Sequence, residues 1–329
     1  MEGPPGLAGG EPEDKHWPDR DEKEMRIAMI GAGAMGSTFA AWLARAGADV
    51  VLYDVDEPHI AAIEAAGLTV VTPAGEIHLS LPATSNIAEI APVDMAVVLV
   101  DSNATRAAAE TVAKVLPPAA FALTLQNGIG NVEALAAVLG RDRVIAGTTY
   151  NSAARLAPGR VLHSNIGATT IGELDGGASE RVSTIAALFR RAGLPIAVSD
   201  NVIGHIWMKF VLNVAINPVS AITGLRPGEI ARTEPARRLL ERVLDEALMV
   251  VAAKGIALPD RDPRAAVLDH AFERYNRPSM LQHIEQGRRT EIDALNGALL
   301  AEARMLGIAC PINEAIVLIV KSLEARRPQ

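Results

Sequence analysis

The first half of the chain alternates short apolar runs with amphipathic stretches. Four runs have the length and the apolar content of buried strands. They are Ile27–Ile30, Val50–Tyr53, Met95–Val100 and Ala122–Gln126. Helix-like stretches separate the earlier runs, and this alternation favours a parallel sheet with helices on both faces. Residues 144–149 and 161–171 are expected as the last strands, separated by a Pro158-Gly159 turn.

The pattern changes near Ser199-Asp200. Beyond Ile203 strand signals fade and amphipathic helices follow, over residues 237–254 and 311–321 among others, with a break at Pro259 and Pro263. We therefore predict an α/β protein. A Rossmann-type doubly wound sheet domain (25–199) precedes an all-helical domain (200–329), and residues 1–24 form a disordered acidic tail.

One apolar segment, residues 207–218, carries a regular polar stripe. Lys209, Asn213 and Asn217 stand at i, i+4 and i+8, which places their side chains on one face of an α-helix. A buried lysine is costly unless it is paired or used. The stripe is therefore predicted to face a ligand. The alternative is a helix whose lysine reaches water beside two capping asparagines.

A glycine-rich turn follows the first predicted strand directly. Its residues are Gly31, Ala32, Gly33, Ala34, Met35 and Gly36. Between a strand and a helix, this GxGxxG pattern is typical of dinucleotide binding. Gly31 is expected to permit the tight turn, Gly33 to let a pyrophosphate approach, and Gly36 to let helix and strand pack closely. The pyrophosphate would then sit at the helix N-terminus.

Asp54 ends the second predicted strand, where a carboxylate can accept both ribose hydroxyls of NAD and repel the 2′-phosphate of NADP. Residues 50–68 contain no Arg or Lys to hold that phosphate. The sequence therefore predicts NAD, with NADH preferred over NADPH. In the alternative, Asp54 caps the loop before Pro58 and residues distant in sequence hold the phosphate.

Composition narrows the functional class. The chain has 329 residues, 3% aromatic residues and a net charge of −8, so nucleic-acid binding is not expected. Residues 1–24 carry eight acidic and three basic side chains and lack the apolar core of a signal peptide. We expect no membrane-spanning segment. Cys310 is the single cysteine, which excludes an internal disulfide and a multi-cysteine metal site and favours a reducing cytoplasm.

A second polar cluster spans residues 279–297. Ser279 and Glu291 are twelve residues apart, which is ~18 Å along a straight helix and too far for both to touch one small substrate. Either the helix bends near Gly287, or one of the two residues serves the cofactor side or the lysine. An exposed helix with ordinary surface polar groups is the alternative.

Taken together, these patches resemble the ketopantoate reductase family, enzymes that reduce 2-dehydropantoate to D-pantoate. The resemblance rests on the glycine turn, on Trp207-Met-Lys209 with Asn213 and Asn217-Pro218, and on Ser279-Met-Leu-Gln with Thr290-Glu291. It extends from Met25 to about Arg327. Gln126-Asn127-Gly128 resembles the family's turn beside the nicotinamide, and Gly147-Thr-Thr149 and His163 also fall in family-like settings.

The resemblance implies a role for each matching residue. Lys209 would be the general acid that protonates the forming alkoxide. Glu291 would orient Lys209 or bind substrate and cofactor hydroxyls. Asn213 and Asn217 would bind polar groups of the substrate. Asn127 and Ser279 would hold its carboxylate, with Asn127 also beside the cofactor.

Three positions depart from the family pattern: Asp54 stands where a basic residue is frequent, Asp101 replaces a lysine, and His283 replaces an aspartate. The departures at Asp101 and His283 leave the identity of the substrate open. The alternative is a D-2-hydroxy acid dehydrogenase for another branched or aromatic 2-keto acid. A non-catalytic NAD-binding sensor is a third hypothesis. The C-terminal helices would suit a homodimer, although a buried face and an interface give the same sequence pattern.

Overall fold

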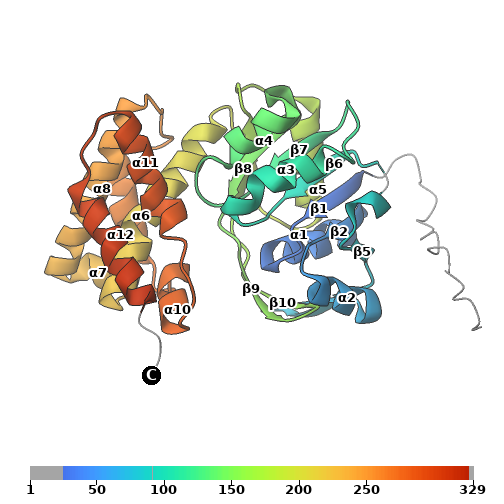
Figure 1. Cartoon of the computed structure of the whole chain (residues 1–329), viewed down its shortest axis with the longest axis horizontal. Helices are drawn as coiled ribbons and strands as arrows, with labels where there is room; N and C mark the ends of the chain where they lie inside the picture. The colour runs from blue at the N-terminus through green and yellow to red at the C-terminus, as the bar shows by residue number, and fades with distance from the viewer. Residues whose placement is uncertain (1–24, 91, 326–329) are drawn as a thin grey trace, which may run out of the picture.

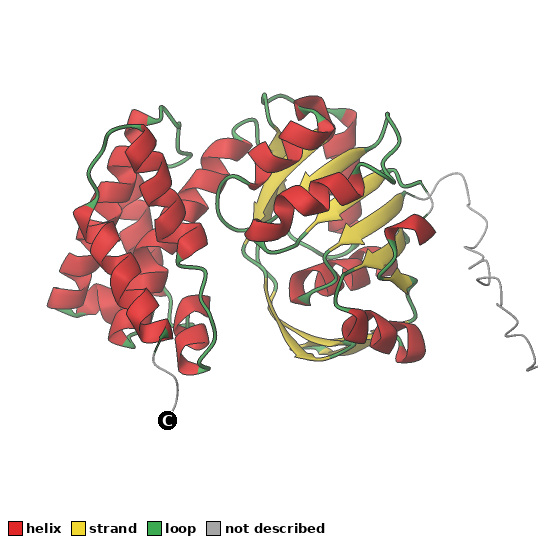
Figure 2. Ribbon diagram, viewed as in Figure 1, coloured by secondary structure: helices red, strands yellow, loops and turns green. Residues whose placement is uncertain are grey.

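The structure is a computed structural model that describes residues 25–90 and 92–325, so the predicted tail over 1–24 lies outside the described residues. Strands occupy one half of the molecule, and the other half is built from helices (Figures 1 and 2). The predicted fold class is confirmed, while the bounds 25–199 and 200–329 stay a prediction.

A large, mostly parallel sheet forms the first half. Its strands, in spatial order, are β12 (Ile196–Val198), β11 (Thr169–Glu173), β8 (Val144–Thr149), β7 (Phe121–Thr124), β6 (Met95–Val98), β1 (Arg26–Ile30), β2 (Asp49–Tyr53) and β5 (Ala83–Thr84). The chain leaves β1 toward β2 and later returns to the other side of β1 as β6. In doubly wound sheets, the crevice at such a reversal binds ligands, at the carboxyl ends of the strands.

Helices and one smaller sheet surround the large sheet. The helices are α1 (Ala34–Arg45), α2 (Glu57–Ala66), α3 (Thr105–Val112), α4 (Asn131–Leu139) and α5 (Glu180–Arg191), with short 3₁₀ turns η1 (Ile87–Glu89), η2 (Ser102–Ala104) and η3 (Arg141–Arg143). The small sheet has the order β4 (Gly75–Leu79), β3 (Leu68–Thr72), β10 (Arg160–Asn165) and β9 (Ser152–Ala157). This second sheet was not predicted.

Two predictions about the strands were wrong. Residues 161–171 form two strands in different sheets, β10 and β11, because the chain crosses from the small sheet to the large one after Asn165. β11 also runs antiparallel to β8, with Thr169 opposite Thr149, so the large sheet is not wholly parallel. The Pro158-Gly159 turn is confirmed as the link between β9 and β10.

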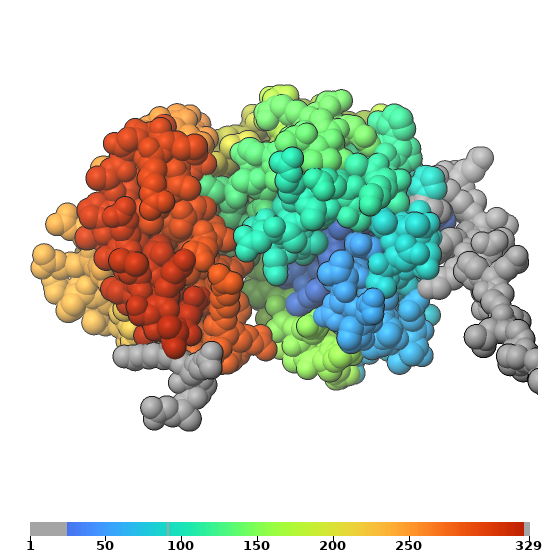
Figure 3. All heavy atoms as spheres, viewed as in Figure 1, coloured from blue at the N-terminus to red at the C-terminus, as the bar shows by residue number. Residues whose placement is uncertain are grey.

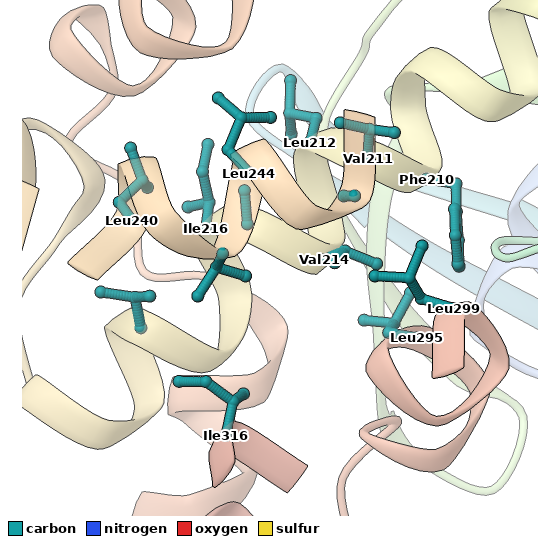
Figure 4. Close-up of a cluster of buried hydrophobic side chains, with 14 of the residues drawn as sticks. Phe210, Val211, Leu212, Val214, Ile216, Leu240, Leu244, Leu295, Leu299 and Ile316 are labelled. Carbon is teal, nitrogen blue, oxygen red and sulfur yellow. The ribbon is translucent and has the colours of Figure 1, made fainter. Parts of the chain in front are cut away.

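The second half is a bundle of helices around α6 (Val202–Thr223). The others are α7 (Pro227–Arg232), α8 (Glu234–Ala253), α9 (Pro263–Glu273), α10 (Ser279–Glu285), the π-helical turn η4 (Asp293–Gly297), α11 (Ala298–Met305) and α12 (Pro311–Glu324). Side chains of α6 such as Phe210, Val214 and Ile216 pack against Leu244 of α8 and Leu295 of η4 (Figure 4). The carboxamide of Asn201 caps the start of α6, and Gly224 ends it in the left-handed conformation.

The expectation of no membrane-spanning segment needs correction, because α6 is long and apolar enough by length and composition. However, 78% of its most apolar window is buried inside the protein, as in the core helix of a globular domain. The same helix also packs against β8 and β11 of the large sheet. It is therefore the element that joins the helical core to the carboxyl end of the sheet.

Candidate active site

The glycine turn lies between β1 and α1, at the reversal point of the sheet. Gly31 has a φ of +97°, and a Cβ there would lie 2.8 Å from the Leu99 carbonyl. A Cβ on Gly36 would lie 1.8 Å from the Gly31 oxygen, whereas one on Gly33 would meet nothing within 4 Å. Gly31 and Gly36 thus permit close packing, and Gly33 borders open space.

The first turn of α1 is suited to an anion. Gly33 is the N-cap of this helix and offers no side chain to its free N–H groups. Ala32 is fully buried and belongs to the core, while Ala34 and Met35 are half-buried beside the opening. Free amides, open space and a helix N-terminus fit the pyrophosphate of a nicotinamide dinucleotide.

Asp54 lies beyond β2, on the same edge of the sheet. Its Oδ1 accepts the N–H of Asp56 at 3.0 Å, so one carboxylate oxygen shapes the loop, as the alternative interpretation expected. Asp56 is also paired with Arg155 of β9. The small sheet therefore brings a cation close to this loop, and its distance in sequence hid it from the sequence analysis.

Lys209 of α6 reaches across to the sheet. Its Nζ donates to Asn127 Oδ1 at 2.6 Å and to the carbonyl of Thr149, the last residue of β8. The Tyr150 ring centroid lies 5.4 Å from Nζ. Burial lowers the pKa of Lys209 to about 8, against the opposing attraction of Glu291. The ammonium is therefore held at the carboxyl ends of β7 and β8 with a pKa near neutrality.

Asn213 and Asn217 follow Lys209 on the same helix, in the predicted register. Asn213 is half-buried, and Asn217 is 8% exposed. Within residues 25–90 and 92–325, neither carboxamide has a hydrogen-bond partner. Two polar groups without partners on an apolar helix are typical of a site completed by a ligand.

The segment 279–297 breaks near Gly287, which has a φ of +64°. Ser279 opens α10, which packs against α6, and Glu291 stands just before η4. Both residues are exposed, and Ser279 has no hydrogen-bond partner in the described part of the chain. A bend near Gly287 was the first of the two geometries that the sequence allowed. Because the segment is not one straight helix, the ~18 Å separation of Ser279 and Glu291 along such a helix does not apply.

Charged groups gather around Glu291. Although its side chain is solvent-accessible, desolvation raises its pKa, with Asp101 adding to the rise and His283 and Lys209 opposing it. Loops from both halves of the molecule thus converge here: a Cβ on Gly128 would lie 3.4 Å from the carbonyl of Ala294. Figure 3 shows the orange residues of the helical half directly against the teal and green residues of the sheet half.

The carbonyl of Thr149 and the ring of Tyr150 were not predicted from the sequence as neighbours of Lys209. Their place in the chain could have identified them as site residues, because they stand at the carboxyl end of a sheet strand, where doubly wound proteins bind ligands. In the described residues, no group of three or more His, Cys, Asp or Glu side chains is placed to hold a metal ion.

Comparison with known proteins places this chain in a family. Two family models match, "Ketopantoate reductase PanE/ApbA" over residues 27–176 and its C-terminal counterpart over residues 201–324. The 2-dehydropantoate 2-reductase of Halobacterium salinarum is 33% identical, with 90% of this chain and 98% of that protein covered. The same enzyme of Pyrococcus horikoshii is 34% identical, with 92% and 98% covered.

Solved structures agree. A PanE/ApbA family ketopantoate reductase from Ralstonia eutropha is 34% identical, with a TM-score of 0.82 over 91% of this chain and 98% of that one. A ternary structure of D-mandelate dehydrogenase with NADH and anilino(oxo)acetate is 26% identical, also with a TM-score of 0.82 and the same coverage. Since the family models and these relatives span nearly all of the described residues, the chain belongs to the ketopantoate reductase family.

Proposed function

We propose that the protein reduces 2-dehydropantoate to D-pantoate with a nicotinamide cofactor, a step of pantothenate biosynthesis. The observation that carries this proposal is the position of Lys209. Its ammonium lies between Asn127 and the end of β8, at the same carboxyl edge of the sheet as the open turn at Gly33, and two unpartnered carboxamides follow it on the same helix. The family of the chain and the names of its relatives support the same reaction.

The reaction needs a proton donor and an electrostatic partner for the forming alkoxide. NAD(P)H, bound at the glycine turn, would supply the hydride. Lys209, in its charged form, would polarise the ketone and then donate a proton to its oxygen. A pKa of about 8 suits this task, because the group is mostly protonated at neutral pH and still gives up a proton readily.

The remaining side chains would bind and orient the substrate. Since an ammonium can only donate, the Asn127 oxygen faces Lys209, which leaves the Asn127 Nδ2 group for the substrate carboxylate or the cofactor. Ser279 would supply a second donor to the carboxylate. Asn213 and Asn217 would bind its other polar groups.

Glu291 would orient Lys209 and accept from substrate or cofactor hydroxyls. Its raised pKa and its accessible position fit a group that is covered once a ligand binds. An ordered Lys209–Glu291 pair would hold the ammonium toward the ketone rather than toward water.

For the cofactor we propose a preference for NADH over NADPH. The support is Asp54, whose second oxygen has no hydrogen-bond partner among the described residues and so is free for a ribose hydroxyl. Arg155, which is paired with Asp56 on the loop after Asp54, is the group that argues for NADPH. We further propose a cytoplasmic homodimer, from the single cysteine and the amphipathic helices α8 and α12.

The test is oxidation of NADH and of NADPH by purified protein, side by side, with 2-dehydropantoate as the acceptor. Fast turnover with NADH and slow turnover with NADPH would support both the substrate and the cofactor. Fast turnover with NADPH alone would support the substrate and contradict the assignment to Asp54. Binding of NADH without turnover would contradict the substrate.

A second candidate is reduction of another branched or aromatic 2-keto acid. Asp101 favours it, because this carboxylate, which acts on Glu291, stands where the family pattern has a lysine and so changes the charge near the expected active site. The similar D-mandelate dehydrogenase fold, solved with NADH, supports the same branch. Phenylglyoxylate tested beside 2-dehydropantoate distinguishes the two, by the ratio of their kcat/KM values.

A further inference from the structure

Hydrogen bonds link α1 to the side chain of Thr149, and the backbone carbonyl of the same residue accepts from Lys209. Trp42 Nε1 donates to Nδ1 of His163 at 3.0 Å, and His163 Nε2 lies 2.8 Å from Asn151 Oδ1. Asn151 Nδ2 donates to Thr149 Oγ1 at 2.7 Å. The carbonyl of Thr149 then accepts from Lys209. Residues from α1, the small sheet and the end of β8 are therefore linked to the lysine of α6.

Each bond of this line has a fixed direction. An indole N–H can only donate, so Nδ1 of His163 must be the acceptor. The neutral ring then carries its proton on Nε2, which donates to the Asn151 oxygen. Burial of His163 lowers its pKa, which keeps the ring neutral. This tautomer obliges Asn151 to turn its amide nitrogen toward Thr149.

Further hydrogen bonds hold the corner at the end of β8. Asn151 Nδ2 also donates to the carbonyl of Gly167 at 2.9 Å, and the hydroxyls of Thr149 and Thr169 lie 2.9 Å apart. A Cβ on Gly167 would lie 2.2 Å from the Tyr150 carbonyl. These bonds add to the β8–β11 pairing, in which Thr149 stands opposite Thr169, so the side chains around Thr149 help to fix its carbonyl.

We propose that His163 is a positioning residue for Lys209, acting through Asn151 to hold the Thr149 carbonyl that accepts from the lysine ammonium. This inference rests on the proposed function for its kinetic consequence, but its structural part concerns Lys209 alone. A carbonyl aimed at the ammonium favours the charged form and keeps the proton donor in place. Trp42 stands in the last turn of α1, away from the glycine turn that opens this helix, so loss of its bond to His163 should not disturb the cofactor site.

A second buried histidine provides a contrast. His59 is as buried as His163, and its ring bonds to the amide of Gly159 and to the Ser37 hydroxyl. Among the described residues, no hydrogen bond of His59 leads to Thr149 or Lys209. Burial alone therefore does not account for the path from His163.

The test compares His163→Phe with His163→Gln. Phenylalanine keeps the bulk and removes both ring nitrogens. Glutamine retains an acceptor for Trp42 and a donor for Asn151. Arg143→Met is the matched control, because Arg143 donates to the carbonyls of Leu116, Pro117 and Ala120 at the opposite end of the sheet. The control should lower Tm without affecting Lys209.

The direct readout is the pKa of Lys209, measured by NMR on protein with ¹³C-labelled lysine. The chain has six lysines, and Lys209→Arg identifies the resonance. We expect His163→Phe to lower this pKa below its wild-type value and to reduce kcat roughly tenfold or more, with KM for the cofactor unchanged. His163→Gln and Arg143→Met should leave the pKa in place.

An unchanged or raised Lys209 pKa in His163→Phe would overturn the proposal. If that variant does not fold, Asn151→Ala acts one bond nearer to Lys209 and should lower the pKa in the same direction, and a wild-type pKa there would equally overturn it. These measurements need no turnover. If the wild-type protein reduces no 2-keto acid, the proposed function is contradicted. The Lys209 pKa values of the variants would still decide whether His163 positions Lys209.

Discussion

The side chain of Asn296 donates to the carbonyl of Val214 at 3.1 Å. That carbonyl lies four residues before Pro218, which stands inside α6 and has no N–H to offer it. Asn296 therefore replaces the hydrogen bond that the proline removes. It does so from the turn that follows Glu291, so the two segments that carry Lys209 and Glu291 are joined at this point.

The same carboxamide continues into a buried network. Asn296 Nδ2 also donates to Asn313 Oδ1 at 2.9 Å, and Asn313 Nδ2 donates to Glu246 at 2.7 Å. The Glu246 carboxylate accepts the backbone N–H groups of Ile312 and Asn313, in the first turn of α12. Because both contacts of Asn296 are to acceptors, its nitrogen is used twice and its buried oxygen is left without a partner among the described residues.

We predict that Asn296→Leu destabilises the protein by about 2 kcal/mol or more, because it leaves two buried acceptors unsatisfied. Pro218→Ala would give Val214 an N–H donor within the helix. Pro218→Ala should therefore raise the free energy of unfolding more in the Asn296→Leu background than in the wild type. Urea unfolding of the four proteins measures this coupling. Strictly additive effects would show that Asn296 does not substitute for the missing helix bond.

In the glycine turn, one substitution should change thermal stability and another should change NADH binding. Gly36→Ala should lower Tm by several degrees, because its Cβ would overlap the Gly31 oxygen. Gly33→Ala should leave Tm nearly unchanged, since its Cβ meets no protein atom within 4 Å, and should weaken NADH binding about tenfold or more by filling the pyrophosphate space. Thermal melting and cofactor fluorescence titration check the pair. Tight NADH binding by Gly33→Ala would place the pyrophosphate elsewhere.

Local patterns predicted the elements near the site, because neighbouring residues decide them. The strand before Gly31 and the helix carrying Lys209 follow from periodicity, whereas the break at Gly287 was one of two possibilities that the sequence left open. The small sheet and the antiparallel β8–β11 pairing were missed, since strand pairing between distant segments leaves little local signal. For the same reason the partners of Lys209 at Thr149, and the Arg155–Asp56 pair, appear only in the structure.

Lys209→Ala should lower kcat by about 10² or more and leave NADH affinity little changed, because the residue would act on the ketone rather than on the dinucleotide. Asn213→Leu is the comparison, since it should raise the substrate KM more than it lowers kcat. Steady-state kinetics with direct NADH titration separate the two effects. Equal turnover of wild type and Lys209→Ala would rule out the lysine as proton donor.

The pH dependence of reduction follows from the lowered pKa of Lys209. The proton donor must be charged, so kcat/KM for ketone reduction should be level near pH 7 and should fall as pH rises through about 8. Oxidation of the product should rise over the same interval. In Lys209→Arg the guanidinium stays charged, so any residual activity should lose this step. A wild-type profile that is flat between pH 7 and 9 would contradict the assignment.

Cofactor choice can be separated from loop structure at Asp54. Asp54→Asn keeps a side-chain oxygen to accept the Asp56 N–H and removes the charge. It should therefore shift the NADPH/NADH ratio of kcat/KM about tenfold toward NADPH with Tm unchanged, because the repulsion of a 2′-phosphate is lost. Arg155→Ala breaks the pair with Asp56 and tests the competing view. If Arg155→Ala depresses NADPH use in the Asp54→Asn background, Arg155 is the cation that meets the phosphate. An unchanged ratio in Asp54→Asn would instead remove Asp54 from cofactor selection, leaving its carboxylate as a loop-forming group.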